Sequence, residues 1–306
     1  MTPLFYIKVK VGKFFANVCS MFVRNREKRH RLRNRLDPLN PERCIRYLER
    51  HYTQQPAIAE YKGDTLQNPV WVCWLQGLEQ APTLVQNCVS SIRRNLSPDQ
   101  QLVIVTASNY ADYVDLSPVI VDKWQRGIIT NTHFSDLFRI YALARHGGCW
   151  IDATCLLTRP IPADILQSPL YIMRTHGEFS YTLIQSCFMC CRKNNYVMRK
   201  WCATMSAYWE HEDTLVNYFT LHLMFIALLQ QDEQFRSLFS EMPVASDESM
   251  HLLLQPLTSG AAYSEALIDQ ARAATFVQKL TYKFPRAFLD DARSLASFLS
   301  QDHLTL

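Results

Sequence analysis

The stretch from His133 to Thr154 reads HFSDLFRIYALARHGGCWIDAT and decides the fold. Its first part places apolar residues at helical spacing and predicts a helix over 132–146. The pair Gly147–Gly148 ends that helix, and Cys149–Ile151 then predicts a short strand that stops at Asp152. Because the carboxyl ends of strands face the ligand crevice in α/β sheets, we expect Asp152 to lie at a ligand site.

A strand–helix–strand unit precedes this stretch. Residues 70–75 (VWVCWL) and 101–106 (QLVIVT) have strand composition, and the helix predicted over 81–95 begins at Ala81-Pro82, where proline is tolerated. A unit of this length predicts two parallel strands joined by a right-handed crossover, as in nucleotide-binding α/β sheets. The other predicted strands are 155–158, 170–173 and 186–191, and the other predicted helices are 195–211, 213–231 and 264–273.

Composition indicates a folded protein with a basic arm. The chain has 306 residues, of which 48% are apolar and 20% charged, so a disordered chain is excluded. The net charge of +4 is the sum of +9 over residues 1–50 and −5 over residues 51–306. No Gly-x-Gly-x-x-Gly follows the first strand and no Gly-x-x-x-x-Gly-Lys occurs, which excludes a dinucleotide-binding dehydrogenase and a P-loop kinase. We therefore expect a basic, mostly helical N-terminal arm over 1–66 and one catalytic domain over 67–306.

Residues 1–36 leave two interpretations open. Their apolar residues are interleaved with lysines and followed by an arginine block, which suits an amphipathic segment on an anionic inner-membrane surface. Alternatively, they form a docked helix with a solvated basic end. A basic block directly after the apolar run 14–23 opposes export, so we expect a cytoplasmic protein that is peripheral on the inner face of the membrane. Nucleic acid is not an expected partner, because the rest of the chain is acidic.

The ten cysteines are scattered through apolar segments. This distribution is typical of reduced, buried thiols in a cytosolic protein. The one cluster, Cys187-x-x-Cys190-Cys191, has no second pair at zinc-like spacing, so a buried strand is favoured there over a metal site.

Asp136 and Arg139 are three residues apart and share one face of the predicted helix. Together with Asp152 they suit a site for a sugar and two phosphates: an arginine fork binds phosphate oxygens, and a carboxylate holds a divalent cation. Taken separately, Asp136 and Arg139 are typical of an ion pair on a helix surface, and Asp152 is typical of a turn residue. All three lie within one stretch of 22 residues that follows an α/β unit, and this favours the functional interpretation.

The chain resembles the capsular polysaccharide synthesis proteins, which are related to initiating mannosyltransferases and glycosylating toxins. The resemblance runs from about Pro69 to Lys283 and rests on these stretches: Trp71–Gly77, Ala81-Pro82, Phe134–Arg139, Gly147–Thr154, Tyr218–His222 and Lys279–Lys283. It implies a GT-A fold, a mixed sheet flanked by helices, and transfer of a sugar from a nucleotide-sugar donor.

The resemblance also implies which residues bind the donor. Catalytic roles fall on Asp136, Arg139 and Asp152. The nucleotide-sugar site implied is Trp74, Gln76, Gly77, Ser135, Asp136, Arg139, Gly148, Trp150, Asp152 and Thr154. A divalent cation, Mn²⁺ or Mg²⁺, is expected at Asp152. Two departures bear on that cation: Thr154 replaces the second acid of the wider superfamily, and Gln278 stands where histidine is expected and is a second candidate ligand.

Three residues are candidates on the acceptor side: Glu178, His222 and Asp247. Loop acids are more often solvated surface groups, and a histidine in an apolar helix is more often a hydrogen-bonded core residue. The expected function is transfer from a UDP-sugar to a growing bacterial cell-surface polysaccharide, such as capsule or O-antigen, with retention at the anomeric carbon. The acceptor would be a glycan or a lipid-linked glycan. The alternative is a non-catalytic, peripheral membrane member that binds nucleotide sugar or a partner transferase.

Overall fold

The computed structural model describes residues 39–302 and 304, and it gives helical positions at 11–12, 14–15, 18–19 and 21. The interpretations of residues 1–36 otherwise lie outside the described residues. No described helix combines the length and the apolar character needed to cross a membrane.

A five-stranded sheet forms the centre of the molecule, with strand order β2-β1-β3-β6-β5. The strands are β1 (Pro69–Cys73), β2 (Gln101–Val105), β3 (Gly148–Ile151), β5 (Leu170–Arg174) and β6 (Ile184–Cys191). β1 pairs in parallel with β2 and β3, whereas β6 is antiparallel to β3 and β5. The predicted mixed α/β sheet and its parallel β1–β2 pair are therefore confirmed.

The chain order creates a switch point between β1 and β3. Helix α4 (Thr83–Arg94) carries the chain from β1 to β2 on one side, and the chain then returns to place β3 on the other side of β1. Crossovers that leave in opposite directions open a crevice at the carboxyl ends of the two strands. The fold therefore provides a crevice where Trp74 follows β1 and Asp152 follows β3.

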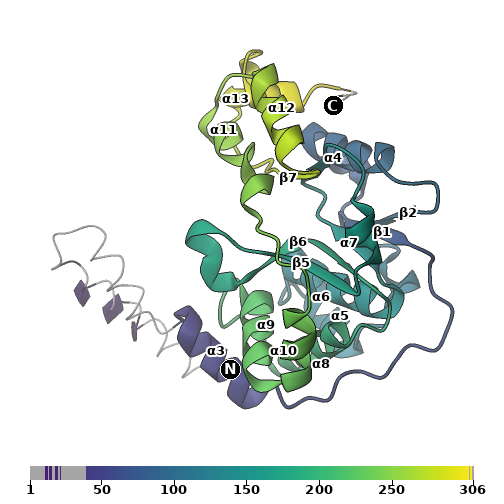
Figure 1. Ribbon diagram of the computed structural model, residues 1–306. Coiled ribbons are helices and arrows are strands. Elements are labelled where there is room, and N and C mark those ends of the chain that lie inside the picture. The colour runs from purple at the N-terminus through teal and green to yellow at the C-terminus, as the bar shows by residue number, and fades with distance from the viewer. Residues whose placement is uncertain are drawn as a thin grey trace.

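Helices cover both faces of the sheet (Figure 1). One face packs on α5 (Pro118–Gln125), α6 (Asn131–His146), α8 (Tyr196–His211), α9 (Thr220–Gln231) and α10 (Glu233–Ser240). The other side holds α4, α7 (Ala163–Gln167), α11 (Leu254–Ser259), α12 (Glu265–Ala274), α13 (Ala287–Asp290) and α14 (Leu295–Leu299). Successive side chains of β1 point to opposite faces of the sheet. Trp71 is therefore buried in the hydrophobic core on the first face, and Val70 in the core on the other.

Helix α6 carries the decisive stretch through the protein interior. The Thr130 side chain caps its start by accepting a hydrogen bond from the His133 N–H, and Gly147 ends it with φ +72°. Most of its residues are buried, including Asp136 and Arg139. The helix therefore places two charged side chains inside the molecule, where each requires a partner.

Helix α3 (Pro41–His51), which the sequence analysis assigned to the arm, packs on the body of the protein beside α9. Its Leu48 is fully buried. The hydroxyls of Tyr47 and Tyr52 both donate to the Glu212 carboxylate. The structure therefore joins α3 to the same core as the sheet.

A second sheet brings the C-terminal region to the first. It contains β4 (Cys155–Leu157) and β7 (Val277–Lys279), which run antiparallel, with Cys155 opposite Lys279. β4 begins just after Asp152, so β7 lies close to the switch point.

Two predictions were wrong. The helix predicted over 213–231 begins only at Thr220. The Tyr208 hydroxyl donates to the Thr214 carbonyl and accepts from the Val216 N–H, and these hydrogen bonds hold the preceding segment as a loop.

The thiols of Cys149 and Cys190 are not free but form a disulfide. These two residues lie directly opposite each other in the antiparallel β3–β6 pair, so their side chains share one face of the sheet.

Candidate active site

A cavity of about 230 Å³ lies where β1 and β3 end. Seven of the ten predicted donor-site residues line it: Trp74, Gln76, Ser135, Arg139, Trp150, Asp152 and Thr154. Tyr282 also lines it, with its ring centroid 5.6 Å from that of Trp74 in an edge-to-face arrangement. The structure thus collects at one edge of the sheet side chains that are far apart in sequence.

Asp152 is the centre of the polar network in this cavity. Its Oδ1 accepts a hydrogen bond of 2.8 Å from Trp150 Nε1, and its Oδ2 accepts one of 2.8 Å from Lys279 Nζ. Arg139 Nη1 lies 3.5 Å from Oδ1. Burial alone would raise the pKa of Asp152, but Lys279 and Arg139 outweigh burial and hold the pKa below its usual value of 3.8. The carboxylate is therefore ionised at neutral pH.

Arg139 joins the helix to the sheet. Its Nη1 donates to the carbonyl of Ser186 at 2.8 Å and to the Ser186 hydroxyl at 2.9 Å, while its Nη2 lies 3.0 Å from Asp136 Oδ1. The other oxygen of Asp136 is 3.3 Å from Nδ1 of His133. Asp136 does not line the cavity, so it acts as a positioning residue that orients the Arg139 guanidinium.

Lys279 is the cationic partner of Asp152 that the sequence analysis did not single out. Its ammonium also donates to Thr154 Oγ1 at 2.7 Å. Burial would lower its pKa, but the adjacent Asp152 carboxylate outweighs burial and keeps the pKa above its usual value. The sequence analysis named the stretch Lys279–Lys283 but gave no role to Lys279. Side chains alternate between the two faces of a strand, so a strand predicted over 277–279 would have placed Lys279 and Gln278 on opposite faces.

Gln278 lies outside the cavity, contrary to its expected role as a metal ligand. It is fully buried, and its side-chain amide bonds the backbone: Nε2 donates to the Ser249 and Ala271 carbonyls, and Oε1 accepts from the Leu253 N–H. Successive residues of β7 point to opposite faces, so Lys279 faces Asp152 and Gln278 faces the helices.

Two predicted glycines do not line the cavity either. Gly148 is at the opposite end of β3, where a Cβ would meet the Pro69 carbonyl oxygen at 2.0 Å. Its role is therefore the close approach of β1 and β3. Gly77 has φ +90° and turns the chain after Gln76, which positions the cavity wall without contributing a side chain.

The three acceptor-side candidates lie in different environments. Glu178 is exposed in η3 (Gly177–Thr182). Asp247 is 3% exposed; its Oδ2 accepts from Gln185 Nε2 at 3.2 Å, and its Oδ1 has no hydrogen-bond partner among the described residues. Gln185 and Ser186 are adjacent in β6, so their side chains point to opposite faces of the sheet, and Asp247 binds the face opposite to the one that the Ser186 side chain offers to Arg139.

His222 is not the hydrogen-bonded core residue that its sequence context favoured. Its Nδ1 is buried without a hydrogen-bond partner in the described part of the chain. Burial lowers the pKa of His222 to about 4, with a smaller opposing effect from Asp136. The imidazole is therefore neutral at pH 7.

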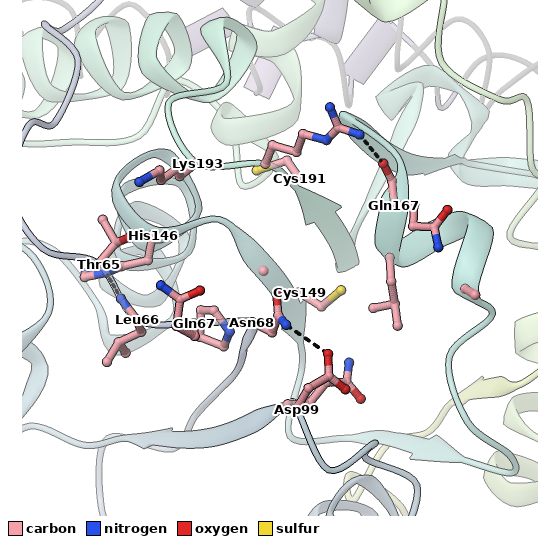
Figure 2. Close-up of a pocket in the computed structure, with 16 residues that line it drawn as sticks. Thr65, Leu66, Gln67, Asn68, Asp99, His146, Cys149, Gln167, Cys191 and Lys193 are labelled. Carbon is pink, nitrogen blue, oxygen red and sulfur yellow. Dashed lines mark hydrogen bonds between the residues drawn. The ribbon is translucent and has the colours of Figure 1, made fainter.

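A larger cavity, of about 600 Å³, lies at the opposite edge of the sheet (Figure 2). Gly148 is the one predicted donor-site residue in its lining. Its polar groups largely bind each other: Asn68 donates to Asp99 at 2.9 Å, and His146 Nδ1 accepts from the Leu66 N–H. We place the candidate active site in the smaller cavity, because Arg139 and the Asp152 carboxylate line it, and Lys279 binds that carboxylate.

The geometry defines an α/β protein with a polar ligand site at the switch point of its sheet. The capsular polysaccharide synthesis protein family matches residues 25–299, and the chain belongs to that family. The resemblance seen in its motifs is therefore confirmed.

Three curated relatives are named as glycosyltransferases. The O-glycosyltransferase PaGT of Phomopsis amygdali is 26% identical over 193 residues, 57% of this chain and 44% of its own length. The O-glycosyltransferase braB of Annulohypoxylon truncatum is 24% identical over 194 residues, 58% of this chain and 44% of its own. The glycosyltransferase afumC of Aspergillus fumigatus is 31% identical over 102 residues, 31% of this chain and 26% of its own. The chain thus spans less than half the length of these relatives.

A solved structure, described as PaToxG Glycosyltransferase, has a TM-score of 0.42 and 12% identity, and the match covers 88% of this chain and 99% of that one.

Proposed function

We propose that this protein is a glycosyltransferase that moves a sugar from a nucleotide-sugar donor, a UDP-sugar, to a hydroxyl oxygen. The observation that carries the proposal is the Asp152 carboxylate held between Lys279 and Arg139 in a cavity at the carboxyl ends of β1 and β3. Ligands of α/β sheets bind at such switch points. Family membership and three relatives named as glycosyltransferases agree with it.

The shape of the cavity suggests how the donor lies. At about 230 Å³ it is smaller than pockets that enclose a drug-sized ligand, which span about 300–1,000 Å³. The diphosphate and sugar would occupy the inner part beside Asp152, and the nucleobase would lie near the mouth against Trp74 and Tyr282. Aromatic rings are suitable partners for a base.

For the acceptor we propose a growing cell-surface polysaccharide, bound as a glycan or lipid-linked glycan. The family description and the names of two relatives, both O-glycosyltransferases, support an oxygen nucleophile. Asp247 is buried, and its Oδ1, which has no hydrogen-bond partner among the described residues, would have to be uncovered before it could accept a hydrogen bond from an acceptor hydroxyl. Residues 1–36 would hold the protein against the cytoplasmic face of the membrane, where anionic lipid and lipid-linked glycans meet.

The test is nucleotide release by the purified chain from a panel of UDP-, GDP- and CMP-sugars. We expect release from one donor, and a loss of about 100-fold or more in the Asp152→Asn variant, because one preorganised polar group at a reacting centre contributes that much. Asp122→Asn is the matched control, since Asp122 is an exposed acid paired with Arg126 on α5. Absence of both release and calorimetric binding for every donor would contradict the proposal.

The same reaction reports the stereochemistry. We propose retention, and NMR of the freshly released sugar should show the anomer of the donor. An inverted anomer would contradict retention and would instead make Asp247 the candidate base, because an inverting enzyme requires a base near the acceptor.

A further inference from the structure

The Lys279 ammonium lies between Asp152, which was expected to hold a divalent cation, and Thr154, which replaces the second acid of the wider superfamily. Its Nζ is 2.8 Å from Asp152 Oδ2 and 2.7 Å from Thr154 Oγ1. The position follows from the pairing of β4 with β7, reinforced where the Leu280 N–H donates to the Thr154 carbonyl at 2.9 Å. A single positive charge is therefore built into this point of the fold.

The donor set around Asp152 does not suit Mn²⁺ or Mg²⁺. Both carboxylate oxygens already accept hydrogen bonds, from Trp150 and Lys279, and two cationic side chains flank them. A divalent cation on this carboxylate would be close to the ammonium and repelled by it. Within residues 39–302, no group of three or more His, Cys, Asp or Glu side chains is arranged to hold a metal ion.

Lys279 is not among the residues that line the cavity, but it lies directly behind two that do. Its side chain is 22% exposed, and the cavity lining includes both of its partners, Asp152 and Thr154. An ammonium has three N–H donors, of which two are used in these hydrogen bonds. The third is available to a phosphate oxygen, and hydrogen bonds from a cation to phosphate are short and strong.

We propose that Lys279 takes the place of the divalent cation and makes sugar transfer independent of metal. This inference rests on the proposed function. The bond between the anomeric carbon and the β-phosphate oxygen breaks, and its electron pair stays on that oxygen. The acceptor oxygen bonds the anomeric carbon, and its proton passes to the departing phosphate. Lys279 donates to the diphosphate and stabilises the charge that accumulates there, while Asp152 and Thr154 hold the ammonium in place.

The experiment measures nucleotide release by the full chain in EDTA and in Mn²⁺ or Mg²⁺. Rates should agree within about twofold in the two conditions. Lys279→Met should lower kcat by about 100-fold or more, whereas binding of the donor weakens much less, because the interaction is strongest in the transition state. Lys279→Arg should recover part of the rate, since it restores the positive charge. Lys193→Met, a change to an exposed lysine at the other cavity, is the control.

A double variant keeps the test decisive if Lys279→Met alone folds poorly. Lys279→Met with Thr154→Asp replaces the ammonium by a second carboxylate, a donor set that suits Mg²⁺ or Mn²⁺. Its activity should require metal and disappear in EDTA.

Three results would overturn the inference: loss of wild-type activity in EDTA, stimulation tenfold or more by Mn²⁺, or unchanged kcat in Lys279→Met. Each of these leaves the proposed function intact, because the donor is still turned over. Absence of both turnover and donor binding, with and without metal, overturns the proposed function itself and this inference with it.

Discussion

Asp152 stabilises the folded protein only while it is ionised. Its folded pKa lies below the usual value of 3.8, since Lys279 and Arg139 outweigh burial. A carboxylate whose pKa is depressed by folding contributes its full stability above the unfolded pKa and loses it as pH falls through the folded pKa. We therefore expect the free energy of unfolding to fall with acidification below about pH 4.

The Asp152→Asn variant isolates this contribution. At pH 7 it removes the carboxylate partner of Lys279, whose side chain is 22% exposed, whereas Arg139 keeps Asp136. Removing one partner of a fully buried pair costs about 3–5 kcal/mol, so we expect a loss below that range here. The difference in free energy of unfolding between wild type and variant should shrink below about pH 4, where wild-type Asp152 is itself becoming protonated. Urea denaturation from pH 7 down to pH 3 measures it, and a difference independent of pH would contradict the assignment.

At the scale of elements, the pairing of β1 with β3 depends on one glycine. Gly148 has φ +84°, and a Cβ there would meet the Pro69 carbonyl oxygen at 2.0 Å. Gly148→Ala must push the two strands apart, and overpacking of this kind costs about 1–3 kcal/mol in addition to the strain of a positive φ.

Gly127→Ala is the matched control, because Gly127 has φ +75° but nothing within 4 Å of the added methyl group. Urea denaturation should show that Gly148→Ala loses about 2 kcal/mol more stability than Gly127→Ala. Equal losses of stability in the two variants would mean that the positive φ alone, and not the close approach of Pro69, requires glycine at position 148.

Local signals predicted the elements that lie close together in sequence. Helical periodicity and a glycine pair located α6, β3 and the position of Asp152 within one residue or two. Contacts between distant segments were not predicted: Lys279 and Asp152 are 127 residues apart, and only the β4–β7 register makes them neighbours. For the same reason Gln278 was mistaken for a ligand, and the Cys149–Cys190 disulfide was missed, because facing directions depend on pairing partners.

At the scale of the whole molecule, charge is divided along the chain. Residues 1–50 carry +9 and residues 51–306 carry −5. A cluster of basic residues attracts an anionic membrane by about 1 kcal/mol for each residue near the surface. We expect the full chain to sediment with phosphatidylglycerol vesicles but not with phosphatidylcholine vesicles, and to be released by salt.

A variant of the arginine block provides the control. Replacing the basic residues between Arg24 and Arg35 by glutamine should abolish sedimentation with anionic vesicles and leave donor turnover unchanged. Binding that is unaffected by salt, or equal on both lipids, would contradict an electrostatic attachment.

The distance along the chain between Asp152 and Lys279 has a consequence for biosynthesis. A ribosome completes β3 and α6 long before it reaches β7, so a nascent chain can present Asp152 and Arg139 without the ammonium between Asp152 and Thr154. Until β7 is translated and pairs with β4, the Asp152 carboxylate lacks its hydrogen bond from the Lys279 ammonium. Under the proposed role of Lys279, the active site is completed only after most of the chain has been translated, and an unfinished polypeptide would not turn over the donor.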